Sequence, residues 1–314
     1  MTGSTGPTAP GDIAFGSLGT RTHTAIRPSG GWFVSNAGWV VGDKATLVVD
    51  TFASERRTRE LMTAIDATRA AAGAADTDKL LVLTHAHGDH ANGAGLLESA
   101  GATVWGAAFT GEELTTNGIQ RFPGLLAEPD WGAVSTPATF RPLAGTQSFD
   151  LGGVVAEVTT LARAAHSGGD SFVHLPGEGA LFAGDLVWNR VTPLALNGSV
   201  TGWLDQLDSI ALLHPGTVVS GHGVPAGPDI IDDTRRYLDW VVELAHEVIA
   251  GTTFTADALR DRRATQLWSD WGCPERDLAN VPRAVSDLTG APYDAMAAMV
   301  AMRDQWNGLI HVDA

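Results

Sequence analysis

The chain of 314 residues contains very little cysteine and few positive charges. Its single cysteine, Cys273, cannot form an intramolecular disulfide bond, so no oxidised framework holds the fold together. The 20 basic residues include only two lysines and face 36 acidic residues, which gives a net charge of −16. Because binding to a phosphate backbone depends on basic patches, this balance argues against nucleic acid as a partner.

The sequence also lacks the segments that take a chain to or across a membrane. No apolar run approaches the roughly 18 residues needed to span a bilayer. Residues 1–12 are polar and have neither the basic region nor the apolar region of a signal peptide. We therefore expect a cytoplasmic protein without a membrane partner, with a flexible tail over residues 1–20.

The remaining composition is that of a globular protein with a sizeable core, since 44% of the residues are hydrophobic and 18% are charged. Short β-rich runs alternate with helical stretches over residues 21–250, and the strand signals disappear after Gly251. This pattern predicts an α/β body over residues 21–250, built as a layered sandwich. A helical extension over residues 251–314 is expected to pack on the same domain, because no long polar linker precedes it.

The hydrophobic periodicity and the turn residues set the expected elements. The expected strands cover residues 31–41, 45–50, 79–83, 104–106, 154–161, 171–175, 180–183 and 217–220. The expected helices cover residues 54–71, 202–213, 230–250, 257–270 and 293–306. Ser54 is the expected N-cap of the first helix, and a loop is expected around Pro274 and Pro282.

The segment most informative about chemistry is THAHGDHANG, residues 84–93, which directly follows an expected buried strand. It places His85, His87, Asp89 and His90 within six residues. Alternate positions can converge on one side of an irregular turn, whereas a helix would point them apart. Imidazole nitrogens together with carboxylate oxygens suit zinc and other borderline divalent metals. The segment therefore predicts a metal site, with a solvated histidine-rich loop as the alternative.

Three further candidate ligands, His166, Asp185 and His222, each follow an expected strand. A carboxylate at the end of the buried run ALFAGD needs a strong partner to offset its desolvation. His222 lies between Gly221 and Gly223, which allow the backbone to approach a site closely. Taken alone, Asp185 could cap a helix and His222 could be an ordinary loop residue. Together with the first cluster, they make seven ligands, enough for two adjacent divalent ions, with zinc expected and iron or manganese left open.

The ordered set HxHxDH, then histidine, aspartate and histidine, resembles the metallo-β-lactamase superfamily over residues 21–225. The resemblance implies an αββα sandwich with the site at one edge, and two metal ions bridged by Asp185. One ion would be held by His85, His87 and His166. The other would be held by Asp89, His90 and His222. The resemblance also implies that Asp50, in LVVDT, supports the first histidine cluster without binding metal, and we expect Asp89 to act in catalysis.

The flanking segments show a narrower resemblance. GGWFVSNAGWVVGD, AHSGGDSFVHLP, GDLVWNRVTPLALNGSV, TRRYLDWV and PERDLANVPRAV resemble the cyclase/thioesterases of actinobacterial aromatic polyketide pathways, of the actinorhodin type. Ser167 and Asn197 depart from that pattern. The resemblance implies an enzyme that cyclises or releases a polyketide, presented as a small molecule or on a carrier protein. A homo-oligomer is compatible with the sequence.

Three other functions remain open. A lactone, amide or β-lactam hydrolase would use the same metal site and is the first alternative. An iron-dependent redox enzyme is disfavoured because no flavodoxin-like segment follows the body. A non-catalytic binding protein is disfavoured because all seven ligands are present.

Several tryptophans are candidates for stacking on a planar substrate. Trp32, Trp39, Trp188 and Trp203 lie in or beside segments expected near the site, although packing in the core would also account for each of them. Trp268, Trp271 and Trp306 lie in the helical extension, which we expect to pack over the site and shape the substrate pocket.

Overall fold

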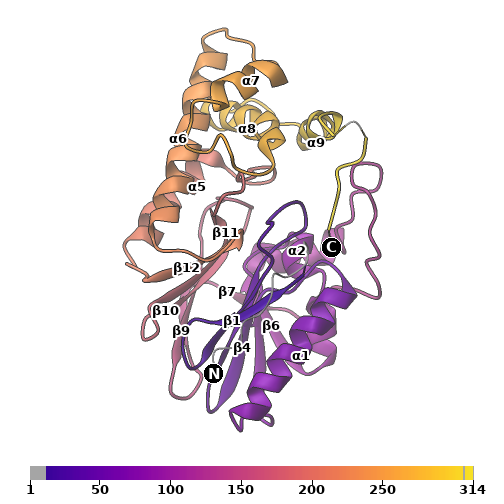
Figure 1. Ribbon diagram of the computed structural model, residues 1–314, viewed down its shortest axis with the longest axis vertical. Helices are drawn as coiled ribbons and strands as arrows, with labels where there is room; N and C mark the ends of the chain where they lie inside the picture. The colour runs from indigo at the N-terminus through magenta and orange to yellow at the C-terminus, as the bar shows by residue number, and fades with distance from the viewer. Residues whose placement is uncertain (1–11, 307, 314) are drawn as a thin grey trace.

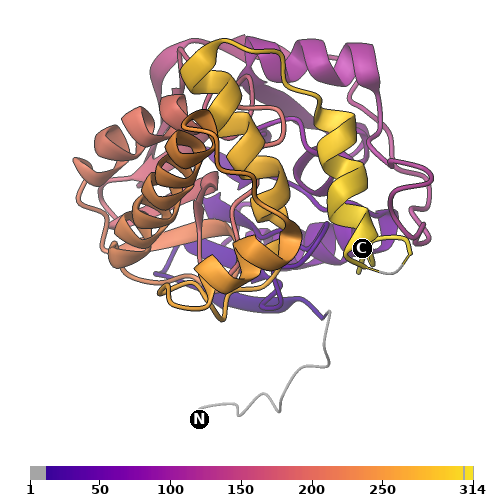
Figure 2. The ribbon, with the colours of Figure 1, turned by 90° about the horizontal axis from the view of Figure 1, so that it is seen from above.

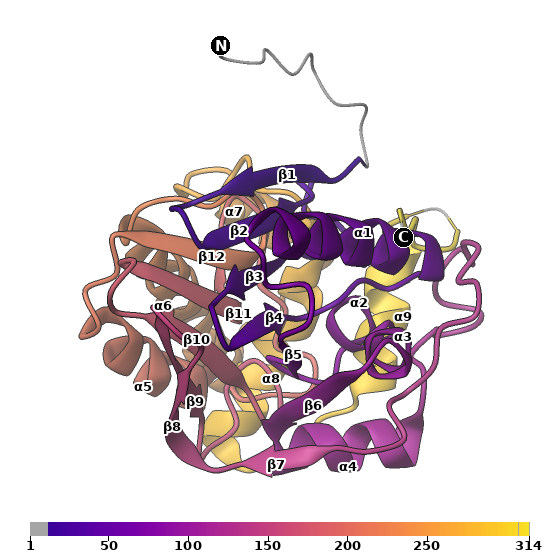
Figure 3. The same cartoon turned by 90° about the horizontal axis from the view of Figure 1, so that it is seen from below.

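Two β-sheets packed face to face, with helices on their outer sides, form the body of the protein (Figure 1). The computed structural model describes residues 12–306 and 308–313. Seen from below, α1 covers the outer side of the first sheet, and α5 and α6 lie outside the second (Figure 3). These layers confirm the αββα sandwich.

The first sheet has seven strands in chain order. Its strands are β1 (Ala14–Ser17), β2 (Thr22–Ile26), β3 (Ala37–Val41), β4 (Ala45–Val49), β5 (Asp78–Val82), β6 (Ala102–Ala107) and β7 (Arg141–Leu143). The pairs from β1 to β4 are antiparallel, and those from β4 to β7 are parallel. Strand β1 contradicts the expected flexible tail over residues 14–17, because it pairs with β2; residues 1–11 of that tail lie outside the described residues.

The second sheet has five strands in the order β12-β11-β10-β9-β8. Its strands are β8 (Gly145–Asp150), β9 (Val155–Thr160), β10 (Ser171–Leu175), β11 (Ala180–Trp188) and β12 (Thr217–His222). Strand β11 continues past the expected end at residue 183, so Asp185 lies inside a strand. The β11–β12 register shifts between Phe182 and Gly184 and again before Trp188. Such irregularities re-aim side chains at a sheet's edge, and here the affected stretch contains Asp185.

Four helices lie in the part of the chain that forms the first sheet: α1 (Glu55–Ala71), α2 (Gly88–Ala91), α3 (Ala94–Ser99) and α4 (Ala108–Asn117). The others are α5 (Val200–Ala211), α6 (Asp229–Ile249), α7 (Ala256–Arg263), the 3-10 helix η1 (Pro274–Arg276), α8 (Asp277–Thr289) and α9 (Ala295–Asp304). Ser54 is the N-cap residue of α1, but its side chain makes no capping hydrogen bond. No helix in the described part of the chain is long and apolar enough to cross a membrane.

Helix α8 corrects the expectation of a loop around Pro282. The proline lies inside the helix, where it removes one backbone hydrogen bond. The helix nevertheless forms because it buries Ala279, Val281 and Ala284 and packs against α6. The expected helix over residues 257–270 is shorter and ends at Arg263.

One hydrophobic cluster joins the C-terminal helices to the second sheet. It contains Trp188 of β11, Trp203 of α5, Tyr237 of α6, and Trp268 and Val281 from beyond residue 250. Figure 2 shows α8 and α9 lying across the end of the sandwich that is uppermost in Figure 1. The helical segment after residue 250 therefore shares a core with the second sheet.

Candidate metal centre

All seven predicted ligands lie together at one edge of the sandwich, although they come from both sheets. The segment after β5 carries four of them, two in a loop and two in α2, and the other three come from the loop before β10, from β11 and from the end of β12. Their donor atoms fall into two groups, within each of which all atoms lie within 4.8 Å of one another. The groups are His85, His87, His166 and Asp185, and Asp89, His90 and His222. The structure thus brings the seven candidate side chains together.

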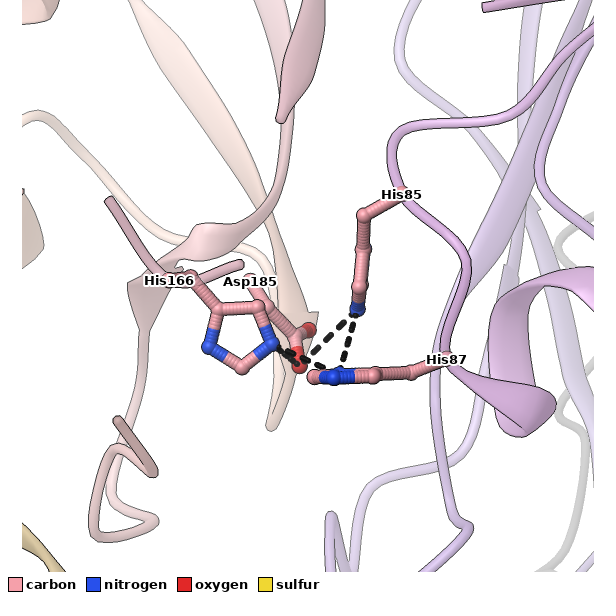
Figure 4. Close-up of side chains that lie close together, drawn as sticks. All are labelled: His85, His87, His166 and Asp185. Carbon is pink, nitrogen blue, oxygen red and sulfur yellow. Dashed lines mark hydrogen bonds and ion pairs between the residues drawn. The ribbon is translucent and has the colours of Figure 1, made fainter. Parts of the chain in front are cut away.

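The first group brings three imidazole nitrogens to a common point (Figure 4). His87 Nδ1 lies 3.0 Å from His85 Nε2 and 2.9 Å from His166 Nε2. Burial lowers the pKa of all three histidines, and that of His166 to about 3, so the rings are neutral. Neutral nitrogens gathered with a carboxylate form the donor set that binds a divalent cation.

Hydrogen bonds on the outer side of three rings fix their tautomers. Nδ1 of His85 donates to Thr84 Oγ1 at 3.0 Å, because that hydroxyl donates its own proton to Asp50. Nδ1 of His90 faces Asp50 Oδ2 at 2.8 Å, and Nδ1 of His222 faces the carbonyl oxygen of Gly30 at 3.1 Å. These partners occupy Nδ1 of each ring, so Nε2 is the nitrogen that points into the site and would bind a metal, which is the arrangement that metal-binding histidines require.

Asp185 reaches both groups of donors. Its Oδ2 lies 3.3 Å from His166 Nε2 and 3.4 Å from His222 Nε2, while its Oδ1 lies 3.1 Å from His90 Nε2. Burial disfavours its carboxylate, but the facing histidines outweigh burial and hold its pKa well below the ordinary value. Asp185 Oδ1 and His90 Nε2 are both buried and make no hydrogen bond. A carboxylate and nitrogens left in this way fit a cation between them.

Asp89 is the carboxylate of the second group of donors. Its Oδ2 is 3.2 Å from His222 Nε2, and its backbone carbonyl accepts a hydrogen bond from Ser35 Oγ at 2.6 Å. Burial raises the pKa of this carboxyl, but His90 and His222 outweigh that effect and lower it to about 2. Asp89 is therefore ionised at neutral pH.

Glycine is required where β12 passes Asp185, as the sequence predicts for the residues flanking His222. A Cβ on Gly221 would lie 1.8 Å from Asp185 Oδ1. Gly223 has a φ of +85°, and a Cβ there would lie 1.9 Å from the carbonyl oxygen of Asn189. These two residues let the strand come close enough to bring His222 to the metal ligands.

Asp50 supports both groups of donors. Its Oδ1 accepts from the Thr84 backbone at 2.7 Å, and its Oδ2 accepts from Thr84 Oγ1 and faces His90 Nδ1. Asp50 therefore contacts His90 directly and reaches His85 through Thr84. Thr84 and Gly30 were not predicted from the sequence, because neither residue type carries a ligand signal.

Replacing Asp50 with asparagine is expected to weaken metal binding about 10- to 100-fold, because an amide offers one acceptor oxygen where the carboxylate offers two. Titration with a competing chelator measures the loss. Asp66→Asn, which changes an exposed carboxylate on α1, is the matched control. Equal metal affinity in Asp50→Asn and the wild-type protein would contradict the supporting role.

A cavity opens onto the candidate metal ligands and has mostly apolar walls. Its lining comprises Trp32, Phe33, His87, Asp89, Gln120, Phe122, His166, Asp185, Trp188, Leu194, Leu196, Asn197, His222, Arg276 and Met299. Trp188 stacks on His222 with ring centroids 4.2 Å apart and an angle of 2° between the planes. Two residues of the C-terminal helices, Arg276 and Met299, contribute to this wall.

Two of the four candidate tryptophans, Trp32 and Trp188, line the cavity. Trp39 packs in the core, as the alternative reading allows, since it stacks on His23 and donates a hydrogen bond to Thr68 of α1. Trp203 is a core residue that packs edge-on against His166 and donates to the carbonyl of Leu186. Trp268, Trp271 and Trp306 are absent from the lining of this cavity.

Comparisons with known proteins agree with this arrangement. The family model described as the metallo-beta-lactamase superfamily matches residues 30–222. A hydroxyacylglutathione hydrolase of Jannaschia sp. (strain CCS1) is 28% identical over 241 residues, which cover 72% of this chain and 80% of that protein. A metallo-beta-lactamase type 2 of Bacteroides fragilis is 24% identical over 247 residues, covering 74% of this chain and 88% of that protein.

Solved structures resemble the fold. A metallo-beta-lactamase from Pontibacter korlensis superposes with a TM-score of 0.59 at 18% identity, covering 73% of this chain and 99% of that chain. The DIM-1 metallo-beta-lactamase gives a TM-score of 0.58 at 18% identity, with 73% of this chain and 98% of that chain covered. At this identity the likeness concerns the fold alone.

Proposed function

The chain belongs to the metallo-β-lactamase superfamily of metal-dependent hydrolases, and we propose that it acts on a carbonyl of an aromatic polyketide as a cyclase, a thioesterase or both. The observation that carries the proposal is the cavity over the ligand cluster, whose walls are aromatic and apolar. Such walls favour a planar, largely apolar substrate over a small polar one.

The seven side chains would hold two divalent ions, and we propose zinc. Ions at these positions supply Lewis-acid activation of a carbonyl and of water. The protein's own part is to fix the donors and to exclude bulk water. Trp32 and Phe33 form one wall of the cavity, and Leu194 and Leu196 form part of another. Asp89, ionised and facing the cavity, accepts a hydrogen bond from the attacking group and orients it.

Two further observations support a thioester or polyketide substrate. The segments that resemble aromatic polyketide cyclase/thioesterases include the stretches that carry Trp32, Leu194 and Arg276 in the cavity wall. The relative from Jannaschia is named for an acylglutathione, whose acyl group is attached through sulfur. Both observations favour a substrate with an activated acyl group.

Three arginines on α6 and α7 do not form a free dock for an acidic carrier protein. Arg235 pairs with Asp208, Arg260 with Asp257, and Arg262 with Glu247. Because each of these charges is already matched, tight docking of an acidic carrier is disfavoured. We therefore propose that the polyketide substrate is presented by a transiently bound carrier or as a free molecule.

The deciding assay is incubation with a carrier-bound octaketide, followed by mass analysis of the products. A cyclised product or release of the free acid is expected. Unchanged octaketide alongside brisk hydrolysis of nitrocefin or of an acyl-homoserine lactone would contradict the proposal. That result would favour a β-lactam, amide or lactone hydrolase, the candidate that the Bacteroides fragilis relative supports.

Replacing Asp89 with alanine is expected to lower kcat by about 10²- to 10⁴-fold with little loss of stability, because the residue lies at the cavity and not in the core. Turnover and thermal unfolding are measured on the same preparation. Asp208→Ala, which removes an exposed carboxylate of α5, is the control. Activity within twofold of wild type in Asp89→Ala would contradict the assigned role.

A further inference from the structure

Arg276 is a buried guanidinium in the wall of the metal-site cavity. The residue ends η1, is 2% exposed, and lines the same cavity as His87, Asp89 and His222. Its guanidinium carbon lies 4.8 Å from the centre of the Trp32 ring and 4.9 Å from that of Trp188. The positive charge is thus removed from bulk water and placed beside the ligand cluster.

The guanidinium has far fewer partners than it can use. Nη1 donates to the carbonyl oxygen of Thr192 at 2.8 Å, while Nε is buried and has no hydrogen-bond partner. Within residues 12–306 and 308–313, no carboxylate oxygen lies within 4.0 Å of a guanidinium nitrogen of Arg276. The neighbouring Glu275 is engaged elsewhere, since its Oε1 accepts from Trp32 Nε1 at 2.7 Å. A guanidinium offers five N–H donors, so most of its capacity is unused.

Three of the four other buried arginines in the described part of the chain have an acidic partner, and the fourth, Arg69, donates to three backbone carbonyl oxygens. Arg263 meets both carboxylate oxygens of Asp277, at 3.0 and 2.9 Å. Arg27 lies 3.6 Å from a carboxylate oxygen of Asp313. Because a buried charge with few partners is costly, Arg276, which has no carboxylate partner and a single carbonyl acceptor, needs an explanation.

We infer that Arg276 binds an anionic group of the substrate, a carboxylate or an enolate on a planar, largely apolar molecule. A guanidinium recognises a planar anion through paired N–H donors. The indole rings of Trp32 and Trp188 flank the guanidinium itself, and Phe33, Leu194 and Leu196 give the same cavity an apolar surface that suits the rest of an aromatic anion. With metal ions bound nearby, the cavity is positively charged inside a protein whose net charge is −16.

The position of Arg276 relates the anion to the reacting group. Trp188 touches both ends of the site, since its ring stacks on His222 and lies beneath Arg276. A substrate anchored at Arg276 is therefore separated from His222 of the ligand cluster by a single side chain, that of Trp188. This inference rests on the proposed function only in assuming that the substrate reacts at the ligand cluster. Arg276 itself lies outside residues 30–222, so it is a feature added by the C-terminal helices.

The test compares two probes of equal shape without a reacting bond, 2-naphthalenesulfonate and its neutral analogue methyl 2-naphthyl sulfone. Binding to the metal-loaded full chain is measured by calorimetry. The wild-type protein is expected to bind the sulfonate at least about 10-fold more tightly than the sulfone, a ratio that corresponds to about 1.4 kcal/mol. Arg276→Gln is expected to remove that preference and to leave the affinity for the sulfone within about twofold.

Two variants separate charge recognition from a structural role. Arg276→Lys, which keeps the charge, should retain part of the preference. Arg236→Gln makes the same change in net charge at an exposed arginine paired with Asp233, and should retain all of it. Equal affinity of the wild-type protein for both probes, or an equal loss of both in Arg276→Gln, overturns the inference. Because neither probe can react, failure of the octaketide assay leaves this result unaffected.

Discussion

Replacing Asp185 with alanine is expected to reduce the bound metal from two ions per chain to one or none and to lower turnover at least about 10³-fold. The reason is geometric, because its two oxygens face different donors. Oδ1 lies 3.1 Å from His90 Nε2, and Oδ2 lies 3.3 Å from His166 Nε2. Removing the side chain takes a ligand from both groups at once. Elemental analysis after gentle purification, together with turnover on the same sample, measures the effect.

Asp205→Ala, which removes an exposed carboxylate paired with Arg163, is the control for Asp185→Ala and should keep both ions. Circular dichroism establishes that the variant is folded. The assignment of two metal ions would be contradicted if the wild-type protein contained one ion or none and the Asp185→Ala variant had the same metal content. The metal content of Asp89→Ala should lie between that of the wild-type protein and that of Asp185→Ala, because the Asp89 carboxylate belongs to the second group alone.

Much of the candidate site could be predicted because its signal is local. His85, His87, Asp89 and His90 fall in one short segment, and their residue types limit what they can bind. The supporting contacts could not be predicted in the same way. Thr84 acts through its hydroxyl and Gly30 through a backbone carbonyl, groups that nearly every sequence offers at many positions.

The fold shows the same division between local and tertiary causes. Strands such as β4 and β5 were predictable because a continuous apolar run forms each buried strand. Helices α2 and α3 were missed because four and six residues are too few for a periodic pattern. Helix α8 was missed because Pro282 is a local signal against a helix, whereas packing against α6 decides the outcome.

The sequence could not predict which of its tryptophans face the cavity. Trp32 and Trp39 lie in the same apolar segment, yet only Trp32 faces the cavity. Trp39 lies on β3 and packs toward α1, whereas Trp32 precedes the strand. Residue type alone predicts that both are buried, but the start of β3 at Ala37 decides which one reaches the site.

Replacing Asp277 with alanine is expected to lower the free energy of unfolding by about 3–5 kcal/mol, because it leaves the buried guanidinium of Arg263 without its partner. Both residues are 2% exposed, and Arg263 also donates to Thr192 Oγ1 at 2.6 Å. Tyr237 donates to Asp277 Oδ1 at 2.7 Å and loses that acceptor as well. Urea unfolding of the metal-loaded chain measures the change.

The double variant Arg263→Met/Asp277→Leu is expected to be markedly more stable than Asp277→Ala, although it removes the whole pair. Burial raises the pKa of Asp277 despite Arg263 and Tyr237, which shows that desolvation outweighs the attraction. Removing both charges removes that cost, whereas removing one leaves it in full. Tyr237→Phe, which deletes one hydrogen bond, should cost only about 1 kcal/mol. A double variant no more stable than Asp277→Ala would show that the pair itself holds α7 and α8 to the loop at Thr192. Arg276 donates a hydrogen bond to the carbonyl oxygen of Thr192, so its position would then depend on the Arg263–Asp277 pair.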